Sequence, residues 1–417
     1  MCSGVGTAEA ARAVLQATVN ESPDTRHPFR MDIRTENNPK CRQILADNHE
    51  WCNLASGCSH PKPHLFHDIL SLNSNYAALL GPAGGGASFV SKKRRICRSV
   101  LVEEQPCMWH SEGGLGHCCV PYADFGCSGL PCTDMSVAGK RLGQEGPTSP
   151  VYVTHGKFLS RKKIPLFVLA LDMGMVEDTH EDYDLYQLFV TPQDCGHAGT
   201  ARERTYVIGS HKELTSCKQD PFQMLEKCRR KMRTVRTQPK DYLVADPWEI
   251  TLEAMTVINR RKISWTPNAM GEVVDLRGLL TTREQAALHE YEAEYRRRYA
   301  KDPRADKNLV LFLGDNPSYS LNWSAVSKRV PTLRMNSRTG LLWVPSRNRW
   351  LVARERLATL GWPVTLDMAS GMGAPLVEAS DYLRAAELAG NAMSLPCVGL
   401  AQLLALACFA PMAAQTM

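Results

Sequence analysis

The sequence predicts an α/β protein with a large core and a smaller second lobe. The chain has 417 residues, of which 44% are hydrophobic and 22% are charged, a composition typical of a folded globular protein longer than one minimal domain. Helical and strand-like stretches alternate over residues 1–80, which favours a sheet covered by helices. From about 211 to 335 the sequence becomes polar, basic and irregular, and helical apolar sequence resumes over 349–409.

Charge and cysteine content limit the function classes. The formal net charge of +6 favours a polyanionic partner over an acidic one. Fifteen cysteines, an odd count in a long chain without a recognisable signal peptide before residue 20, favour reduced thiols in a nuclear or cytosolic setting. The apolar tail Leu395–Ala410 is shorter than the roughly 20 residues of a spanning helix, and Pro396 and Gln402 interrupt it. We therefore expect a buried C-terminal helix and no membrane partner.

The first 80 residues predict a glycine turn and two strands that each end near an acid. Gly4-Val5-Gly6 opens a helix. A short strand then ends at Glu36 and is followed by a helix over 39–48, and a second strand over 64–69 ends near Asp68. Acids at successive strand ends are common in nucleotide-binding folds.

Residues 81–120 differ in kind and predict an inserted loop. They begin with three glycines at 84–86, continue with the basic run Lys92–Arg95 and end in a Cys/His-rich stretch. Three buried strands are then expected, at 122–128, 164–171 and 205–209.

One helix stands out within the basic stretch. Thr281 and Glu284 fit a capping box, and apolar and aromatic residues follow at helical spacing until Asp302-Pro303 ends the helix. We expect its tyrosines to pack in a core rather than to stack on nucleic acid, namely Tyr291, Tyr295 and Tyr299.

The strongest chemical signal follows the strand at 122–128. Asp124–Cys132 places a cysteine in a loop stiffened by glycine and proline, and a glycine-rich basic loop comes next. This segment resembles the catalytic loop of the cytosine-C5 DNA methyltransferase family, in which a Gly-x-Pro-Cys turn precedes a glycine-rich run. The resemblance implies that Cys132 is the nucleophile, whose thiolate adds to C6 of cytosine so that C5 can accept a methyl group. Lys140 and Arg141 are candidates for the positive charge that a thiolate needs.

Further segments resemble the family's cofactor motifs in the expected order. Cys2–Gly6 resembles the first motif for S-adenosylmethionine (SAM), with cysteine in the position of a phenylalanine. Glu36 matches the acid that holds the SAM ribose, and Asp68 matches the acid near the adenine amine. Gly390–Met393 with Pro396 resembles the tenth motif, which closes the SAM pocket. The resemblance implies a cofactor pocket lined by Ser3, Gly4, Gly6, Glu36, Asp68, Ile69 and Asn391.

Segments for substrate recognition also match. Arg202-Glu203-Arg204 resembles the eighth motif, in which arginine holds the target cytosine, although Thr200 stands where the family usually has glutamine. Arg354-Glu355 and Gly361-Trp362-Pro363 resemble the ninth motif, which supports the recognition lobe. The intervening segment begins with six basic residues without an acid among them, a run suited to phosphate contacts. They are Lys227, Arg229, Arg230, Lys231, Arg233 and Arg236.

The resemblance implies an architecture and a partner. The fold would be the class I SAM-dependent methyltransferase fold, Rossmann-like, with a mostly parallel sheet flanked by helices and a smaller target-recognition lobe. The implied division is a SAM-binding and catalytic core over 1–210 with a loop insert at about 81–120, a recognition lobe over 211–348, and a return to the core over 349–417. The implied partner is DNA and the implied location is the nucleus, or the cytoplasm for a bacterial or tRNA-directed enzyme.

Two departures from the family pattern bear on activity. Ala170-Leu171-Asp172 stands where the family has Glu-Asn-Val, so alanine replaces the glutamate that contacts cytosine N3. Asp172 is displaced by about 6.6 Å along the strand and cannot substitute without a bulge. Losing a general acid typically slows a step by about 10²–10⁴-fold. The glycine turn also begins at residue 2, so we expect the strand that normally precedes it to be missing.

Three functions therefore stay open. The first is an active DNA cytosine-C5 methyltransferase that flips its target base. The second is a tRNA cytosine-C5 methyltransferase, and the third is a catalytically impaired or inactive relative that binds SAM or nucleic acid.

Two Cys/His clusters raise the separate question of zinc. Neither has paired Cys-x-x-Cys spacing, so we expect no metal site. The first cluster is Cys52, Cys58, His60, His64 and His67, and the second is Cys107, His110, His117, Cys118 and Cys119.

Overall fold

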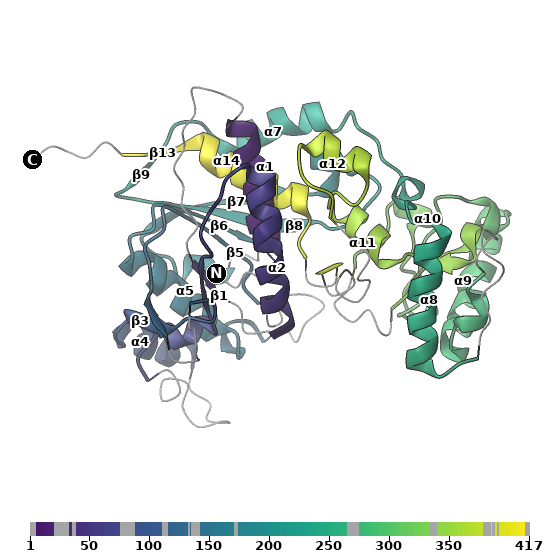
Figure 1. Ribbon diagram of the computed structural model, residues 1–417, viewed down its shortest axis with the longest axis horizontal. Helices are drawn as coiled ribbons and strands as arrows, with labels where there is room; N and C mark the ends of the chain where they lie inside the picture. Colours follow the sequence, from purple (N-terminus) through teal and green to yellow (C-terminus); the bar gives the residue numbers. More distant parts are fainter. Residues whose placement is uncertain are drawn as a thin grey trace, which may run out of the picture. The chain divides into compact units, whose positions relative to one another are not determined.

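The chain forms two compact units, which are described separately (Figure 1). Unit 1 comprises Met1–Val190, Arg204–Lys227 and Cys397–Met417, and unit 2 comprises Thr191–Glu203 and Cys228–Pro396. The structure is a computed structural model. It describes residues 6–20, 33–35, 39–75, 88–110, 116–131, 134, 142–170, 174–264, 275–333, 340–377, 385, 388–389 and 392–412.

A four-stranded mixed sheet lies at the centre of unit 1. Its strand order is β5-β6-β8-β7, where β5 pairs parallel with β6 and the other two ladders are antiparallel. The strands are β5 (Phe125–Ser128), β6 (Leu166–Ala170), β7 (Tyr183–Val190) and β8 (Arg204–His211). The predicted strands at 122–128, 164–171 and 205–209 are confirmed, and β7 is an addition that the sequence analysis did not identify.

Two smaller ladders precede this sheet in the chain. β1 (Ile33–Thr35) pairs parallel with β2 (His64–Phe66), and β3 (Glu104–Pro106) pairs antiparallel with β4 (His117–Cys119). Within the part of the chain that the structure describes, no ladder joins β1–β2 to the four-stranded sheet. The mixed α/β class that the sequence predicts is confirmed. The sheet is less parallel than expected, because among the described strands only β1–β2 and β5–β6 pair in parallel.

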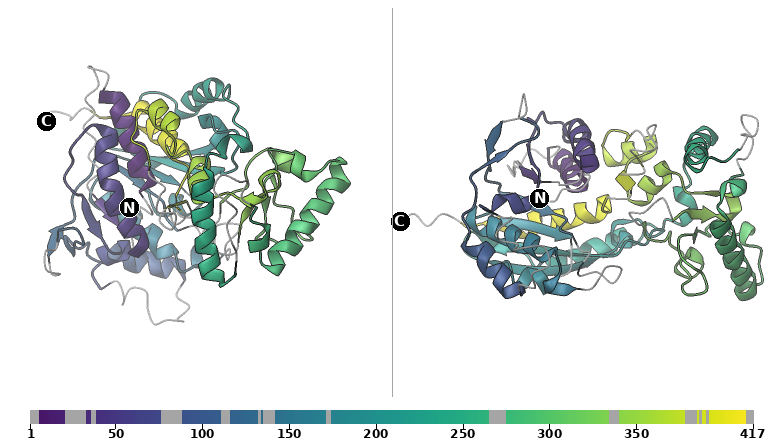
Figure 2. Two further views of the ribbon diagram at one scale, coloured as in Figure 1. Left: turned by 45° about the vertical axis from the view of Figure 1, so that its right-hand side comes forward. Right: turned by 90° about the horizontal axis from the view of Figure 1, so that it is seen from below.

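Helices cover both faces of the sheet (Figures 1 and 2). Successive side chains of β6 point to opposite faces, and four of its five residues are buried, so both faces must be covered. Phe167 and Leu169 join the core cluster under α4 (Phe89–Arg98) and α5 (Ser149–Arg161). The other face is covered by α1 (Thr7–Asn20) and α14 (Leu395–Cys408). These two helices are joined by Gln402, whose side-chain Nε2 donates to the Ala8 carbonyl at 2.9 Å.

The predicted helices of unit 1 are present. The stretch at 39–48 belongs to α2 (Pro39–Ser56), and the apolar C-terminal tail forms α14, which continues into β13 (Phe409–Pro411) paired with β9 (Thr215–Cys217). No described helix combines the length and apolarity needed to cross a membrane. The remaining short helices are η1 (Ile69–Leu72), η2 (Gly143–Glu145) and α6 (Gly174–Glu177), and α7 (Pro221–Met232) spans the boundary of the units.

The expectation of a loop over 81–120 is wrong for its described residues. Helix α4 begins after the N-cap Ser88, and its Phe89 and Ile96 are buried in the core. At its other end the buried Lys157 ammonium donates to the carbonyl groups of Ile96 and Ser99 at 2.9 and 2.7 Å. A cation there satisfies the last carbonyls of the helix and ties α4 to α5.

Unit 2 has its own core, built largely from helices. The predicted capping box is confirmed: α9 (Thr282–Tyr299) begins after Thr281, whose side chain accepts from the Glu284 N–H. Tyr291 and Tyr295 lie in the core, with Tyr299 packed against it, as predicted. The other helices and strands of unit 2 are η3 (Pro192–Cys195), η4 (Pro239–Tyr242), α8 (Pro247–Arg261), η5 (Arg277–Leu279), η6 (Pro303–Ala305), β10 (Leu311–Phe312), α10 (Ser324–Ser327), β11 (Leu342–Val344), η7 (Pro345–Arg347), β12 (Arg349–Trp350), α11 (Ala353–Thr359) and α12 (Leu366–Met372).

Candidate active site

The loop that carries the predicted nucleophile is anchored on both sides of it. Cys132 itself lies outside the described residues. Before it, the Pro131 carbonyl accepts from the Tyr152 hydroxyl at 3.1 Å. After it, the buried Asp134 carboxylate accepts from the Thr148 N–H and hydroxyl at 2.7 and 2.6 Å. Tyr152 and Thr148 belong to α5 and its N-cap, so one helix end fixes the backbone that flanks position 132.

The N-terminus of α5 also explains why a buried acid is tolerated there. Asp134 is 1% exposed and accepts two hydrogen bonds at the start of a 13-residue helix, where the macrodipole favours negative charge. The predicted cations Lys140 and Arg141 lie outside the described residues.

A buried chain of hydrogen bonds supports the end of β5 just before this loop. Ser128 Oγ lies 3.1 Å from His155 Nε2, His155 Nδ1 lies 2.9 Å from His180 Nε2, and His180 Nδ1 lies 2.9 Å from Thr179 Oγ1. We name these four residues the buried chain. They come from β5, from α5 and from the segment after α6, so the chain joins three elements.

The direction of each hydrogen bond follows from Thr179, the last residue of the buried chain. Thr179 donates its only hydroxyl proton to the Met175 carbonyl at 2.6 Å, so His180 Nδ1 must donate to Thr179. His180 Nε2 is then the acceptor for His155 Nδ1–H, and His155 Nε2 accepts from the Ser128 hydroxyl. Both imidazoles are therefore neutral.

The electrostatics of the chain agree with neutral rings. Burial lowers the pKa of His180 to about 4, and burial together with the neighbouring His180 holds the pKa of His155 well below its ordinary value. Ser128 is 3% exposed and both histidines are 1% exposed. A substrate cannot reach this Ser–His pair, so its arrangement supports the fold and does not provide a nucleophile.

One glycine makes this approach of histidines possible. A Cβ at Gly156 would lie 1.9 Å from the Thr179 carbonyl oxygen. Only glycine allows the backbone at 179–180 to pack on α5 so closely, and that packing places the two rings in contact.

Three more positions of the predicted site meet at one edge of the sheet. Ser128 at the end of β5 is opposite Leu169, and Ala170 ends β6 opposite Tyr206. Because β8 runs antiparallel to β6, its first residue, Arg204, lies at the edge where β6 ends, and its side chain is exposed. The loop after β5, the position of the absent glutamate and Arg204 therefore share an edge. Asp172 lies outside the described residues.

Arg202 belongs to unit 2, and its guanidinium holds backbone. It donates to the carbonyl groups of Leu333 and Ala392. Ala392 follows the predicted cofactor residue Asn391, which lies outside the described residues. Arg202 thus links the eighth and tenth motif segments, which the sequence did not predict.

Gly6 is the described residue of the predicted glycine turn, and it directly precedes α1. Gly6 has φ +82°, and its carbonyl accepts from the Ala10 N–H at 2.9 Å, so the turn leads directly into the helix. A side chain is disfavoured there because φ is positive. Ser3 and Gly4 lie outside the described residues.

The two predicted cofactor residues that follow β2 differ in exposure. Asp68 is half-buried and caps η1, where one carboxylate oxygen accepts from the Leu70 N–H at 2.9 Å. Ile69 is 2% exposed and belongs to the hydrophobic core. The role of Ile69 beside the cofactor stays a prediction, in which its buried side chain would support the pocket from the core. Glu36, which follows β1, lies outside the described residues.

Part of the predicted basic run has an internal role in unit 2. Arg233 Nη2 lies 2.7 Å from the fully buried Asp194 carboxylate, and Arg229 Nε lies 3.3 Å from it. Burial opposes ionisation, but the Thr191 N–H and then the two arginines hold the pKa of Asp194 below its ordinary value. The other four members of the run are exposed.

The ninth motif segment also has a structural role. Glu355 is completely buried and binds Arg349 through two contacts of 2.7 Å, while Arg354 pairs with Glu249 at 2.7 Å. The Leu395 N–H donates to the Leu360 carbonyl at 2.9 Å, which joins this segment to the tenth.

Comparison with known proteins finds similarity only at the level of structure. Neither a family model nor a curated protein matches the sequence. A methyltransferase of Entamoeba histolytica, EhMeth, overlaps with a TM-score of 0.44 and 9% identity, over 97% of this chain and 96% of that one. The S. pombe Dnmt2 methyltransferase gives 0.43 and 13%, over 97% and 96%. An E. coli DNA modification methyltransferase encoded within a prophage gives 0.45 and 16%, over 97% of each chain. Likeness of this degree assigns no activity, so the proposal below is argued from the residues.

Proposed function

We propose that this chain transfers a methyl group from SAM to C5 of cytosine in a nucleic acid, with Cys132 as the nucleophile and DNA as the substrate. The observation that carries the proposal is the anchored loop at the end of β5. Pro131 and Asp134, the described residues on either side of the proposed nucleophile, are both held by α5, and Ala170 and Arg204 lie at the edge of the sheet where β5 ends. Nucleophiles of α/β enzymes are commonly placed at the ends of strands in this way.

The proposed chemistry needs a cysteine at that position. The Cys132 sulfur would form a bond to C6 of cytosine, which makes C5 nucleophilic enough to accept the methyl group. Loss of the C5 proton to a base would then break the C6–S bond and restore the ring. When bound, SAM supplies the electrophilic methyl group. Arg204 would hold the base from the start of β8, and Arg202 would position the segment around Ala392.

The described residues fit a nucleotide-like cofactor at the proposed pocket. Gly6 directly precedes α1 and has no side chain that would obstruct a cofactor. The N-terminus of a helix also favours anionic groups. Asp68 uses one carboxylate oxygen for its own turn, and its second oxygen is available for a donor such as an adenine amine. Glu36 follows the neighbouring parallel strand and would serve the ribose hydroxyls.

We place target recognition in the segment 211–348. The exposed basic residues around the end of α7 suit phosphate contacts, which give salt-dependent affinity without sequence choice. Arg229 and Arg233 contribute less to such contacts because Asp194 already binds them.

A second candidate function rests on Ala170. This residue ends β6 at the shared edge and provides no group that can hold a proton on the cytosine ring. A natural enzyme with strongly reduced turnover, or a relative that binds without turnover, follows from that substitution. A general acid contributes about 10²–10⁴-fold to a step.

The test is transfer of labelled methyl from SAM to DNA and, separately, to tRNA. Wild type, Cys132→Ser and Ala170→Glu are compared at equal folded concentration, with the exposed Cys97→Ser as the matched cysteine control. We expect transfer to DNA that Cys132→Ser abolishes, Cys97→Ser preserves and Ala170→Glu raises by about 10²-fold or more.

Each other outcome has a definite meaning. Label in tRNA alone would replace DNA as the substrate. A silent wild type with an active Ala170→Glu would establish the impaired relative. Turnover that survives Cys132→Ser, or silence of every variant on both nucleic acids, would contradict methyl transfer through this cysteine.

A further inference from the structure

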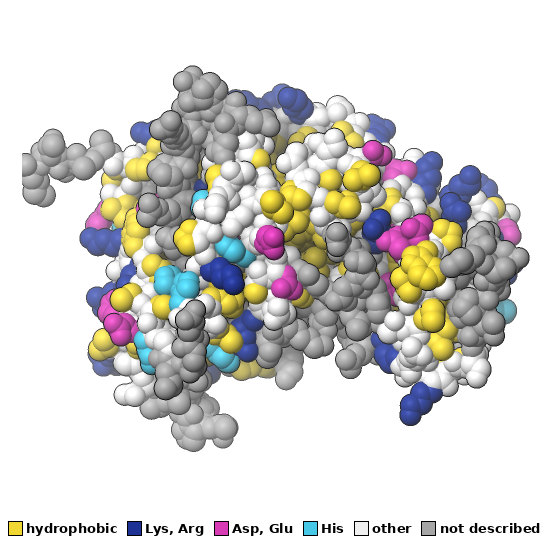
Figure 3. Space-filling model, viewed as in Figure 1, with side chains coloured by type: hydrophobic (Ala, Val, Ile, Leu, Met, Phe, Trp, Pro, Cys, Tyr) yellow, Lys and Arg dark blue, Asp and Glu magenta, His cyan; other side chains and the backbone are white. Residues whose placement is uncertain are grey.

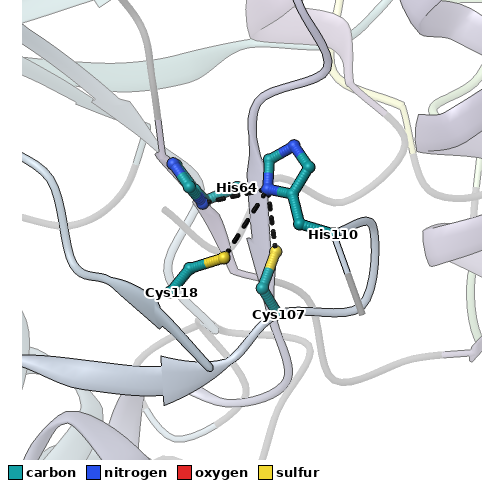
Figure 4. A group of neighbouring side chains, drawn as sticks. All are labelled: His64, Cys107, His110 and Cys118. Atoms are coloured by element: carbon teal, nitrogen blue, oxygen red, sulfur yellow. Dashed lines mark hydrogen bonds between the residues drawn. The ribbon is translucent and has the colours of Figure 1, made fainter. Parts of the chain in front are cut away.

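Four side chains outside the proposed active site converge in unit 1 (Figure 4). His64 begins β2, Cys107 and His110 follow β3, and Cys118 lies in the middle of β4. Their possible ligand atoms all lie within 4.8 Å of one another. Histidine side chains reach the surface over this part of the unit, in cyan on the left of Figure 3. We name these four residues the Cys/His cluster.

The distances from His110 Nδ1 to the other three ligand atoms match the edges of a tetrahedron around a metal ion. The two Nδ1 atoms of His64 and His110 are 3.2 Å apart, and His110 Nδ1 lies 3.5 Å from Cys107 Sγ and 3.7 Å from Cys118 Sγ. Zinc binds nitrogen at about 2.0–2.1 Å and sulfur at about 2.3 Å, so tetrahedral edges are about 3.3 Å between nitrogens and about 3.6 Å between nitrogen and sulfur. These three distances agree with the expected edges, and the other pairs of ligand atoms lie within 4.8 Å of one another.

The backbone fixes the tautomer that a metal requires. His110 Nε2 lies 3.0 Å from the Lys62 carbonyl, which can only accept, so the ring proton sits on Nε2. The Nδ1 lone pair of His110 therefore faces the other three residues. Orientation of a ligand histidine through its second nitrogen and a carbonyl is the usual arrangement in metal sites.

The atoms around His110 Nδ1 are more numerous than its acceptor capacity. A neutral imidazole has one acceptor lone pair, yet three atoms from three residues approach His110 Nδ1. One lone pair cannot serve three donors well. A cation at the centre would instead bind all four atoms at once.

We propose that the Cys/His cluster binds one structural zinc ion. Two thiolates and two neutral imidazoles in a tetrahedral arrangement select zinc over the oxygen-binding cations, and the two thiolates neutralise its charge. All four positions are filled by protein, so no coordination site is left for a substrate. The proposal does not depend on methyl transfer, because the cluster shares no residue with the proposed active site.

The ion would crosslink elements that are otherwise short. β2, β3 and β4 have three residues each. The backbone already brings β2 and the end of β3 together, since the Met108 N–H donates to the Leu65 carbonyl at 2.9 Å and Phe66 forms an antiparallel β-bridge with Cys107. Three-residue strands are marginal on their own, and a metal crosslink stabilises such a segment directly.

The test is zinc content and affinity of the full chain purified under reducing conditions. The variants Cys118→Ser and His110→Gln remove ligands that are half-buried or exposed, so their effect on folding is limited. The matched controls are Cys119→Ser and His117→Gln, which change the exposed neighbours of Cys118 on the same strand. Circular dichroism confirms that each variant is folded.

We expect about one zinc per wild-type chain after dialysis, and loss of at least about 100-fold in zinc affinity in both ligand variants. Both controls should retain wild-type affinity. Cobalt substitution should give a tetrahedral spectrum with thiolate charge-transfer bands, which weaken in Cys118→Ser.

Three results would overturn the proposal. The first is a folded wild-type chain that does not retain added zinc. The second is equal zinc affinity in the ligand variants and the controls. The third is a Cys107–Cys118 disulfide in protein isolated under reducing conditions, because a disulfide removes both thiolates.

Discussion

Two histidine clusters of unit 1 differ in how their polar atoms are satisfied. In the buried chain, which runs from Ser128 to Thr179, each imidazole accepts one hydrogen bond and donates one. In the Cys/His cluster three atoms approach the single lone pair of His110 Nδ1. The comparison teaches that histidine content alone does not distinguish the two clusters, whereas the number of atoms around one lone pair does, and that difference supports the proposed zinc site.

The two clusters also differ in access. Both histidines of the buried chain are 1% exposed, whereas His110 is exposed and His64 is half-buried. A metal ion can therefore enter and leave the Cys/His cluster from solvent. The histidines of the buried chain can be protonated from solvent only when the protein opens, so their protonation is linked to unfolding.

The largest expected effect is on the packing that creates the buried chain. Gly156→Ala places a Cβ 1.9 Å from the Thr179 carbonyl oxygen, so the backbone at 179–180 must move away from α5. We expect the free energy of unfolding to fall by at least about 3 kcal/mol, the upper range for overpacking. Denaturant unfolding of the purified variant measures this.

The matched control is Gly399→Ala in α14, where a Cβ would make an ordinary contact of 3.9 Å with Ala11. Removing glycine from a helix interior stabilises by up to about 1 kcal/mol, so this variant should be equal to or more stable than wild type. Equal stability of the two variants would disprove the tight packing of α5. A chelator should not change the difference between them, since neither residue touches the Cys/His cluster.

The next effect is a loss of stability in acid. Burial lowers the pKa of His180 to about 4 from an ordinary 6.5, so the unfolded state binds more protons between these values. The stability from the neutral ring is fully present above pH 6.5 and is lost as the pH falls through about 4. Two and a half pH units correspond to about 3 kcal/mol. His155 is shifted in the same direction, by burial and by His180.

The measurement must separate this effect from metal loss, because protonation of cysteine and histidine also releases zinc in acid. Unfolding free energies are therefore compared from pH 7 to pH 4.5 with chelator present throughout. His180→Gln should be less stable at pH 7 but show a flatter pH dependence. An unchanged slope in that variant would assign the acid effect to other groups, of which His155 is the nearest candidate because it contacts His180 and burial lowers its pKa as well.

Sequence reasoning succeeded where the signal is contiguous. The strands at 122–128 and 164–171 are buried apolar runs, and the Thr281 capping box is a local pattern that tertiary contacts do not override. β7 was missed because it is an edge strand, with Phe189 62% exposed and an acid at 184, so its alternation is weak. The glycines at 84–86 suggested a loop, although amphipathic sequence follows them and forms α4.

The two histidine clusters could not be predicted in the same way. His64 and Cys107 fall in different clusters of the sequence because 43 positions separate them, and backbone hydrogen bonding between β2 and the end of β3 brings them together. Likewise His155 and His180 become neighbours because glycine at 156 admits the backbone at 179. Both arrangements depend on packing between distant segments, which spacing rules for Cys and His do not include.

The smallest expected effect concerns a single hydrogen bond of the buried chain. Ser128→Ala removes the hydroxyl that donates to His155 Nε2 and leaves a buried acceptor without that donor. We expect a loss of about 1–2 kcal/mol in unfolding free energy at pH 7, the usual cost of one unmade buried hydrogen bond. Zinc content should not change, because the Cys/His cluster lies on other elements. If Ser128→Ala were neutral, the direction of the chain inferred from Thr179 would be wrong, since Ser128 would then not be the donor on which His155 depends.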